Sequence, residues 1–196
     1  ACAEARAEID ALALVVLSLA ESEADTLMPG YTHLQRGQPV TFGHHLLAWL
    51  EMLDRDRARF AAAAAAAAES PLGAGALAGS TLPLPPPPRP LRNSIDAVAD
   101  RDFALDYLYA AAVLFAHLSR IGEELVLWST AEFGFVSLPE SAATGSSMMP
   151  QKLNPDVAEL VRGKAGSAIG RLAGLLATVK GLPLAYDRDL QEDKPP

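Results

Sequence analysis

Three polar segments interrupt an otherwise apolar, helix-forming sequence, and they carry the side chains that could do chemistry. Catalytic groups concentrate in loops that a rigid scaffold holds in place. The first segment, Thr32 to Gln35, contains His33, the one histidine of four outside the predicted helices. An imidazole titrates near neutral pH and can act as a general acid or base. A lone loop histidine is more often solvent-facing or structural, so both interpretations stay open here.

The second segment, Gly145 to Asn154, combines a hydroxyl, a cation and an amide in one loop. Small residues around Ser146 indicate a mobile flap. Lys152 and Asn154 precede a predicted helix start, where positive charge and free amide donors can stabilise an anion. Each residue alone has a structural explanation, as a turn residue, a surface charge or a helix N-cap. Their combination favours an anion site.

The third segment, Tyr186 to Lys194, is dense in polar and charged residues. It follows an apolar turn at Gly181 to Pro183, which is typical of the end of a helix. Its composition predicts a solvated loop, and its charge pattern alone implies no ligand.

Long helices must position these three segments. Apolar residues at spacings of three and four predict helices around residues 9–19, from the N-cap Thr41 through the alanine tract to Ala68, and around 114–128. A last helix should begin at Asn154, with Asn154 as its cap. Tyr31 to Gln38, bracketed by prolines, is expected to be a loop. No alternating β-branched run competes, so the predicted fold class is all-α, a long-helix bundle.

Residues 70–93 are rich in glycine and proline and predict an irregular connection. We treat residues 1–196 as one helical-bundle region that contains this connection. The first and last residues cut into patterned sequence, which suggests a fragment of a longer chain.

The amino-acid composition of the chain argues against several classes of binding partner. A net charge of -8 without a basic run argues against nucleic acid, because phosphate binding requires clustered Lys and Arg. The single cysteine, Cys2, cannot form an internal disulfide, and no His and Cys cluster has metal-ligand spacing, so a cytoplasmic protein without a metal is expected. Leu12 to Ala20 is too short to span a bilayer and lacks the basic flank of a signal peptide, so no membrane association is expected.

Long stretches of the chain resemble the signatures of the argininosuccinate lyase family, within the fumarase and aspartase superfamily. Met28 to Arg36 resembles the family's histidine loop, and Gly145 to Asn154 resembles the superfamily's Gly-Ser-Ser-x-Met-Pro signature. Gln151 is similar to this family, whereas fumarases carry glycine there. Gly181 to Lys194 and Asn93 to Phe103 are also similar. The resemblance covers nearly the whole chain.

The resemblance implies a β-elimination that splits argininosuccinate into L-arginine and fumarate, the last step of arginine biosynthesis. Proton removal beside a carboxylate creates a doubly charged aci-carboxylate, so the site needs a base, an acid and fixed positive charge. By resemblance, Ser146 is the base, His33 the acid, and Glu159 orients or charges the imidazole. Some accounts of the family reverse acid and base, and that choice stays open. Lys152 and Asn154 would bind the developing carboxylate.

The same resemblance implies further substrate contacts and an assembly. The matched substrate-contacting positions are Thr32, Tyr186, Gln191 and Lys194. Family members need no cofactor or metal, and they form homotetramers whose active sites combine three subunits. An isolated chain of this kind is therefore expected to be inactive.

Three departures from the family pattern stand out. The N-terminal domain with its Ser-Arg-Asn-Asp motif and the C-terminal helical domain have no counterpart here, so the chain resembles a central fragment. Leu153 stands where many members have a second lysine, which should weaken anion binding. The proline run from Pro83 to Pro90 replaces a longer connection.

Two alternative functions remain. The chain could belong to another lyase of the superfamily, which tests with adenylosuccinate and aspartate would distinguish. It could also be a non-catalytic, structural descendant, as the lens crystallins of this family are. Retention of Ser146, His33, Lys152 and Asn154 weighs against the structural alternative.

Overall fold

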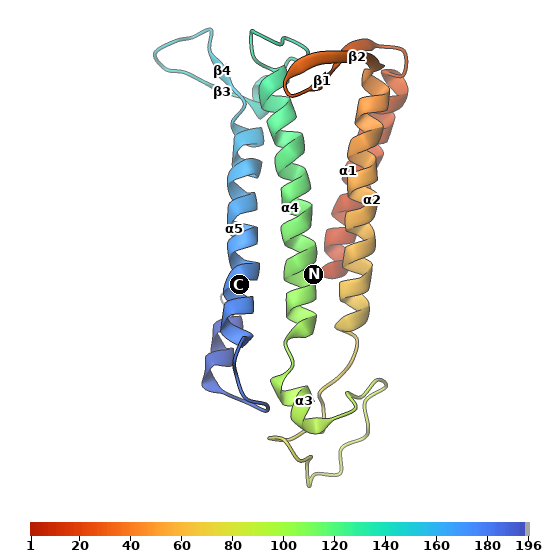
Figure 1. The fold of residues 1–196 in the computed structure, drawn as a ribbon, viewed down its shortest axis with the longest axis vertical. Coiled ribbons are helices and arrows are strands. Elements are labelled where there is room, and N and C mark those ends of the chain that lie inside the picture. The colour runs from red at the N-terminus through yellow and green to blue at the C-terminus, as the bar shows by residue number, and fades with distance from the viewer. Residues whose placement is uncertain (195–196) are drawn as a thin grey trace. The chain divides into compact units, whose positions relative to one another are not determined.

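The structure is a computed structural model, and it describes residues 1–194. The chain forms two compact units, the first from Ala1–Ala61 and the second from the remainder of the described chain. Long helices dominate both units, as the sequence predicts (Figure 1). The helices are α1 (Cys2–Ser22), α2 (Phe42–Ala66), α3 (Ser94–Ala99), α4 (Asp102–Trp128) and α5 (Asp156–Val179).

The first unit is a helical hairpin in which α1 and α2 run antiparallel. Gly43 allows the close approach at one end, because a Cβ there would lie 2.5 Å from the carbonyl oxygen of Ala20. Further along, Arg57 Nε lies 2.7 Å from Asp10 Oδ1. Thr41 caps α2 as predicted, since its Oγ1 accepts a hydrogen bond from the amide of His44 at 3.2 Å. Apolar side chains of both helices are buried, namely Ile9, Val16, Ala20, Leu46, Trp49, Met52, Leu53 and Phe60.

The segment predicted as a loop between these helices is instead a β-hairpin. Strands β1 (Leu27–Thr32) and β2 (Gln35–Thr41) pair antiparallel, with Thr32 opposite Gln35. The prediction of a loop for 31–38 was wrong because neither strand has the alternating β-branched pattern that marks a strand in sequence. Backbone pairing within a two-stranded ribbon does not require that pattern.

The glycine- and proline-rich residues 70–93 contain no helix or regular strand. One isolated bridge closes the connection, with the Ser70 amide donating to the Arg89 carbonyl at 2.7 Å. The short helix α3 follows directly. Asn93 caps it, because its Oδ1 accepts from the amides of Ile95 and Asp96 at 2.9 and 3.1 Å.

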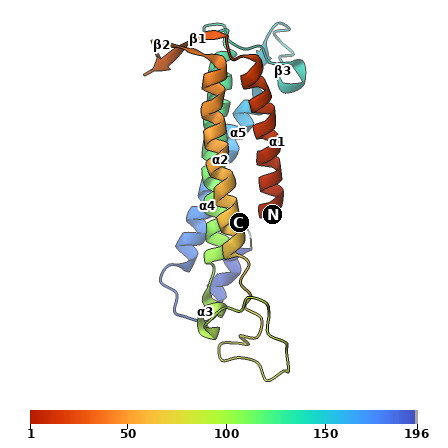
Figure 2. The same cartoon turned by 90° about the vertical axis from the view of Figure 1, so that its right-hand side faces the viewer.

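The second unit is built on α4 and α5, which pack antiparallel along their length (Figures 1 and 2). Gly122 of α4 sits against α5, and a Cβ at that position would lie 2.9 Å from the Ala158 carbonyl oxygen. Further along the pair, Leu108 and Ala111 of α4 line one cavity together with Ser167 and Ala168 of α5. The apolar seam predicted for 114–128 thus lies on a long helix that packs side by side with another.

The connection from α4 to α5 and the segment after α5 carry short elements. They are η1 (Glu140–Ala142), β3 (Thr144–Gly145), β4 (Leu153–Asn154) and η2 (Arg188–Asp193). The predicted cap of α5 was wrong: Asn154 belongs to β4 and pairs with Thr144, Pro155 is the N-cap, and no side chain caps the helix. Gly181 follows the end of α5 with φ of +75°, as the sequence-based end of the helix requires.

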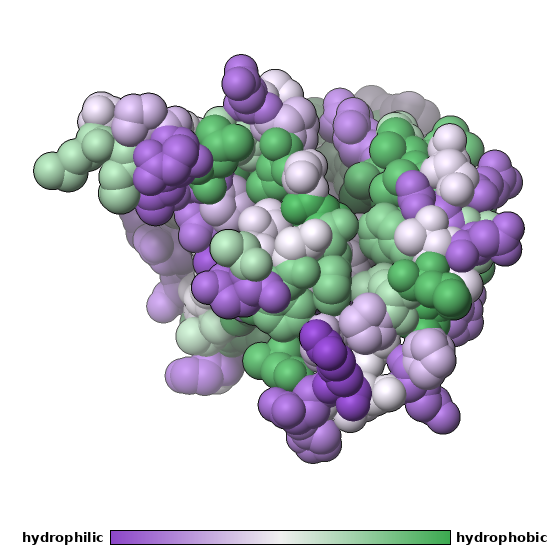
Figure 3. All heavy atoms as spheres, turned by 90° about the horizontal axis from the view of Figure 1, so that it is seen from above, coloured by the Kyte–Doolittle hydropathy of each residue, from purple (hydrophilic) through white to green (hydrophobic). Residues whose placement is uncertain are grey.

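Many large apolar side chains are exposed, and hydrophobic groups lie among hydrophilic ones on the face seen from above (Figure 3). Val157, Leu160, Ile169 and Leu176 of α5 are among them. Within residues 1–194, no helix is both long enough and apolar enough to cross a membrane.

Candidate functional site

The β1–β2 hairpin presents His33 at its turn. His33 and Leu34 have φ of 55° and 56°, so two residues with side chains occupy the left-handed region that glycine normally fills. Both side chains are exposed. Left-handed non-glycine residues cost free energy and concentrate at functional sites. The hairpin therefore holds Thr32 and His33 in an exposed, defined turn of the first unit.

The β3–β4 hairpin forms the flap that the sequence predicts around Ser146. Thr144 pairs with Asn154, and Gly145 with Leu153, so the two ends of the loop are held together. Ser146 Oγ accepts hydrogen bonds from the backbone amides of Met148 and Met149 at 3.3 and 3.1 Å. Two amide dipoles aimed at one oxygen stabilise negative charge on it.

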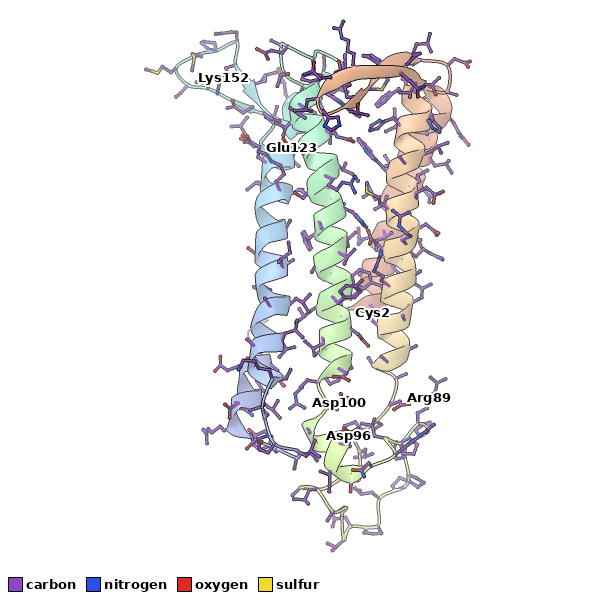
Figure 4. All side chains as sticks on the ribbon, viewed as in Figure 1. Cys2, Arg89, Asp96, Asp100, Glu123 and Lys152 are labelled. Atoms are coloured by element: carbon purple, nitrogen blue, oxygen red, sulfur yellow. The ribbon has the colours of Figure 1, made fainter. Side chains whose placement is uncertain are left out.

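The far strand of the flap carries two paired polar side chains. Lys152 Nζ donates to Asn154 Oδ1 at 2.6 Å. This bond uses the oxygen of the amide and one ammonium proton, so the Asn154 NH₂ and two Lys152 protons are left as donors. Figure 4 shows Lys152 on this hairpin, beyond the N-terminal end of α5. Ser146, Lys152 and Asn154 are thus brought onto a single hairpin, with donors suited to a carboxylate.

Glu159 lies in the first turn of α5 and belongs to a charged network. Its Oε1 lies 3.7 Å from Arg162 Nη2, and Arg162 also pairs with Glu123 of α4. Glu159 and Glu123 are both half-exposed. Within the second unit the partner of Glu159 is therefore an arginine, and the predicted contact of Glu159 with an imidazole stays a prediction.

The third polar segment is more ordered than a solvated loop. Residues 188–193 form the 3-10 helix η2, and Leu190 in its middle is buried, with 2% of its surface exposed. Gln191 Nε2 lies 2.6 Å from the Tyr186 hydroxyl, and Lys194 Nζ lies 3.0 Å from Asp193 Oδ1. Hydrogen bonds within the segment therefore join Gln191 to Tyr186, whereas the Lys194 side chain is held by Asp193.

Two residues outside the predicted site tie this segment to the start of α4. Arg101 Nε donates to Asp193 Oδ2 at 2.6 Å, across 92 positions of sequence. Only 17% and 16% of the two side chains are exposed. Burial acts to raise the pKa of Asp193, but hydrogen bonds from Lys194 and Arg101 outweigh it, and the pKa lies below its usual value. Both residues stand in family-like motifs, which was the available signal.

The flap and the Tyr186 segment do not meet within this chain. The flap precedes α5 and the Tyr186 segment follows it, and α5 has 24 residues. A helix of that length spans about 36 Å at about 1.5 Å per residue. The flap, with β3 and β4, therefore lies beyond one end of the α4–α5 pair, and the chain that follows α5 folds back beside the other half of that helix (Figure 1).

Residues 2–170 match the protein family described as Lyase. The chain belongs to this lyase family. Among curated proteins it is similar to the argininosuccinate lyase of Halorhodospira halophila, at 55% identity over 97% of this chain, and to that of Stutzerimonas stutzeri, at 55% over 96%. The chain spans 43% and 42% of those two proteins, less than half of either.

Solved structures agree with the fold. An EDDS lyase structure in complex with formate superposes with a TM-score of 0.92, at 33% identity, over 96% of this chain and 39% of that one. A class II fumarase from Schistosoma mansoni matches with a TM-score of 0.80 at 16% identity, over 96% of this chain and 46% of that one, which shows the shared fold alone. The predicted helical architecture of the fumarase and aspartase superfamily is confirmed.

Proposed function

We propose that the protein to which this chain belongs is a cytoplasmic argininosuccinate lyase that releases L-arginine and fumarate. Similarity to the argininosuccinate lyases at 55% identity supports the substrate. The arrangement of the flap supports the chemistry. Two backbone amides there donate to Ser146 Oγ, and Lys152 and Asn154 present hydrogen-bond donors on the same hairpin.

The proposed reaction balances as a β-elimination. Ser146 Oγ, as an alkoxide, takes the proton from the carbon next to the succinyl carboxylate. The electron pair of that C–H bond forms the C=C bond of fumarate, and the C–N bond breaks toward the guanidino nitrogen. His33 returns a proton to that nitrogen, which completes L-arginine. The reverse assignment of acid and base to the two residues remains an alternative.

Charge in the transition state concentrates on the carboxylate next to the abstracted proton. Lys152 would place an ammonium against it, and the Asn154 amide would donate a hydrogen bond. Thr32, Tyr186, Gln191 and Lys194 would bind the remainder of the substrate, and Glu159 would act on the imidazole of His33. No step calls for a metal or cofactor.

The distance along α5 supports an assembly with shared active sites. Since the flap lies beyond the N-terminal end of α5 and the Tyr186 segment packs beside the other half of that helix, we expect the two sets to reach one substrate from different chains. A homotetramer with active sites made from several subunits meets this requirement. Neither nucleic acid nor a membrane is a proposed partner.

The test uses a chimera in which this chain replaces the matching part of the Halorhodospira halophila argininosuccinate lyase. Fumarate release from argininosuccinate is followed by ultraviolet absorbance for the chimera, its Ser146→Ala variant and a Ser147→Ala control. We expect activity in the chimera and the control, and a fall of at least about 100-fold for Ser146→Ala. An active Ser146→Ala variant would remove Ser146 as the base.

The EDDS lyase likeness, at 33% identity, favours one alternative substrate. The same chimera assayed with EDDS in place of argininosuccinate decides between the two. A folded tetramer that releases fumarate from neither would point instead to a structural, crystallin-like descendant.

A further inference from the structure

The Tyr186–Lys194 segment is fastened to the start of α4 by one ion pair. Arg101 Nε lies 2.6 Å from Asp193 Oδ2, and both side chains are about five-sixths buried. Exposed ion pairs contribute little to stability because solvent screens them and both side chains lose rotamer freedom. This pair is shielded and short, so it belongs to the stronger, charge-assisted class.

Arg101 is itself held in place before it reaches Asp193. Its Nη1 donates to the carbonyl oxygens of Asp100 at 2.6 Å and Val98 at 3.4 Å, at the junction between α3 and α4. The guanidinium thus spans from that junction to η2, with the fork geometry that a lysine lacks. Figure 4 places Asp100 at this lower end of α4.

Arg101 bonds to a carboxylate 92 positions away, although other acidic residues lie nearer to it in the sequence. Arg101 lines a cavity of about 620 Å³ together with the carboxylates of Asp96, Asp100 and Asp102. Nearer acidic residues were therefore available along the chain, yet Nε bonds to Asp193. One of these acidic residues, Asp100, already accepts a hydrogen bond at its Oδ1 from the backbone amide of Asp102, at 2.8 Å.

Asp193 passes this restraint on to the residues beside it. One carboxylate oxygen, Oδ2, takes the Arg101 bond, and the other, Oδ1, lies 3.0 Å from Lys194 Nζ. Leu190 anchors η2 in the core, and the Gln191 to Tyr186 bond closes the segment. Arg101 and Lys194 therefore bind the two oxygens of the same carboxylate.

We propose that Arg101 is a positioning residue that acts through Asp193 to orient Lys194 and to hold the Tyr186–Lys194 segment ready for substrate. The effect of Arg101 on catalysis rests on the proposed function. The restraint that Arg101 places on the segment depends only on contacts within the second unit. Arg101 would contact no substrate atom.

The experiment compares Arg101→Gln and Asp193→Asn with Arg101→Lys and with an Arg57→Gln control, in the active chimera. Arg57 makes an ion pair of similar length, 2.7 Å to Asp10, but in the first unit. Each variant is examined by amide hydrogen exchange with mass spectrometry over residues 186–194 and by steady-state fumarate release.

Faster exchange is expected over 186–194 in Arg101→Gln and Asp193→Asn, with a KM raised by about 10-fold or more and a smaller change in kcat. Arg101→Lys should recover part of both effects, because it keeps the charge but loses the fork. The Arg101→Gln/Asp193→Asn double variant should resemble either single variant. Arg57→Gln should keep wild-type exchange in the segment and a wild-type KM.

Unchanged exchange over 186–194 in folded Arg101→Gln overturns the proposal, as does an equal KM change in Arg57→Gln. If both Arg101→Gln and Asp193→Asn fail to fold, the pair is structural and the positioning role is also overturned. If the unmutated chimera releases no fumarate, the proposed function fails separately, and the exchange comparison still decides whether Arg101 holds the segment.

Discussion

In the flap, the hydrogen bonds that each polar side chain can offer a substrate depend on the residues next to it. Ser146 has a hydroxyl oxygen that already accepts two backbone hydrogen bonds, and Lys152 is paired with Asn154 on the adjoining strand. Between these polar residues lies Leu153, which is 54% exposed and pairs through its backbone with Gly145. An apolar side chain at this point adds no donor for an anion.

Leu153→Lys should therefore lower the KM for argininosuccinate in the active chimera. A second ammonium beside Lys152 adds attraction for the two carboxylates of the succinyl part of the substrate, and exposed charge interactions of this kind contribute about 0.2–1 kcal/mol, or roughly 1.5- to 5-fold. Steady-state kinetics at low and high salt provide the measurement. Leu153→Gln is the uncharged control, and an equal gain in that variant would contradict the electrostatic explanation.

Among the elements, the α4–α5 pair depends on close backbone approach. Gly122 faces the Ala158 carbonyl, and Ala158 itself is buried. A side chain at such a point must push the two helices apart, because interiors are packed too densely to absorb it. Small residues thus determine the spacing of the pair that separates the flap from the Tyr186 segment.

Gly122→Ala should lower the free energy of unfolding by about 1–3 kcal/mol, because its Cβ would lie 2.9 Å from the Ala158 oxygen. Urea unfolding followed by circular dichroism measures the change. Gly163→Ala in α5 is the matched control, since no atom outside its chain neighbours and its own helix backbone lies within 4 Å of the added Cβ. That variant should gain about 0.5–1 kcal/mol from reduced freedom of the unfolded chain. Equal effects of both substitutions would contradict the packing argument.

The ion pair between Arg101, at the start of α4, and Asp193 of η2 should make the free energy of unfolding depend on pH. The pKa of Asp193 is lowered in the folded chain despite burial, which acts to raise it, because the hydrogen bonds from Lys194 and Arg101 prevail. A carboxyl group with a lowered folded pKa stabilises the fold above its unfolded pKa, near 3.8, and loses that contribution as pH falls through the folded value.

The unfolding free energy of Asp193→Asn should consequently lie below that of the unmutated protein at pH 7. The difference should shrink as the pH falls below about 3.8, when the native carboxyl also becomes neutral. Urea titrations at a series of pH values measure it. A difference that stays constant across this range would show that Asp193 contributes shape rather than charge.

For the whole molecule, the exposed apolar surface is the outstanding property. Leu14, Val15 and Leu17 of α1 are exposed, as are Leu160 and Ile169 of α5. Exposed apolar side chains in such number mark contact sites or aggregation-prone regions. The same surface would be buried in the assembly proposed above.

The isolated 196-residue chain should therefore self-associate or aggregate in solution. Burial of apolar side chains gives the driving force, at about 25 cal/mol per Å² removed from water. Multi-angle light scattering after gel filtration provides the measurement. A monodisperse monomer at micromolar concentration would contradict the expectation.

The sequence by itself determined the helices and indicated the candidate catalytic residues, which remain a prediction. Apolar spacing in α1, α4 and α5 is a local pattern that appears wherever a helix buries one face, and the motifs around His33 and Ser146 are continuous along the chain. The N-cap Thr41 was predictable for the same local reason.

Only the tertiary structure decided which residues far apart in the sequence come into contact and which backbone groups pair. It placed Asn154 in a strand rather than at a cap, paired Arg101 with Asp193 across 92 positions, and packed η2 back against α5. These features depend on which backbone groups remain unpaired and which elements pack together. Such contacts leave no periodic trace along the chain, and that is the physical reason sequence patterns could not supply them.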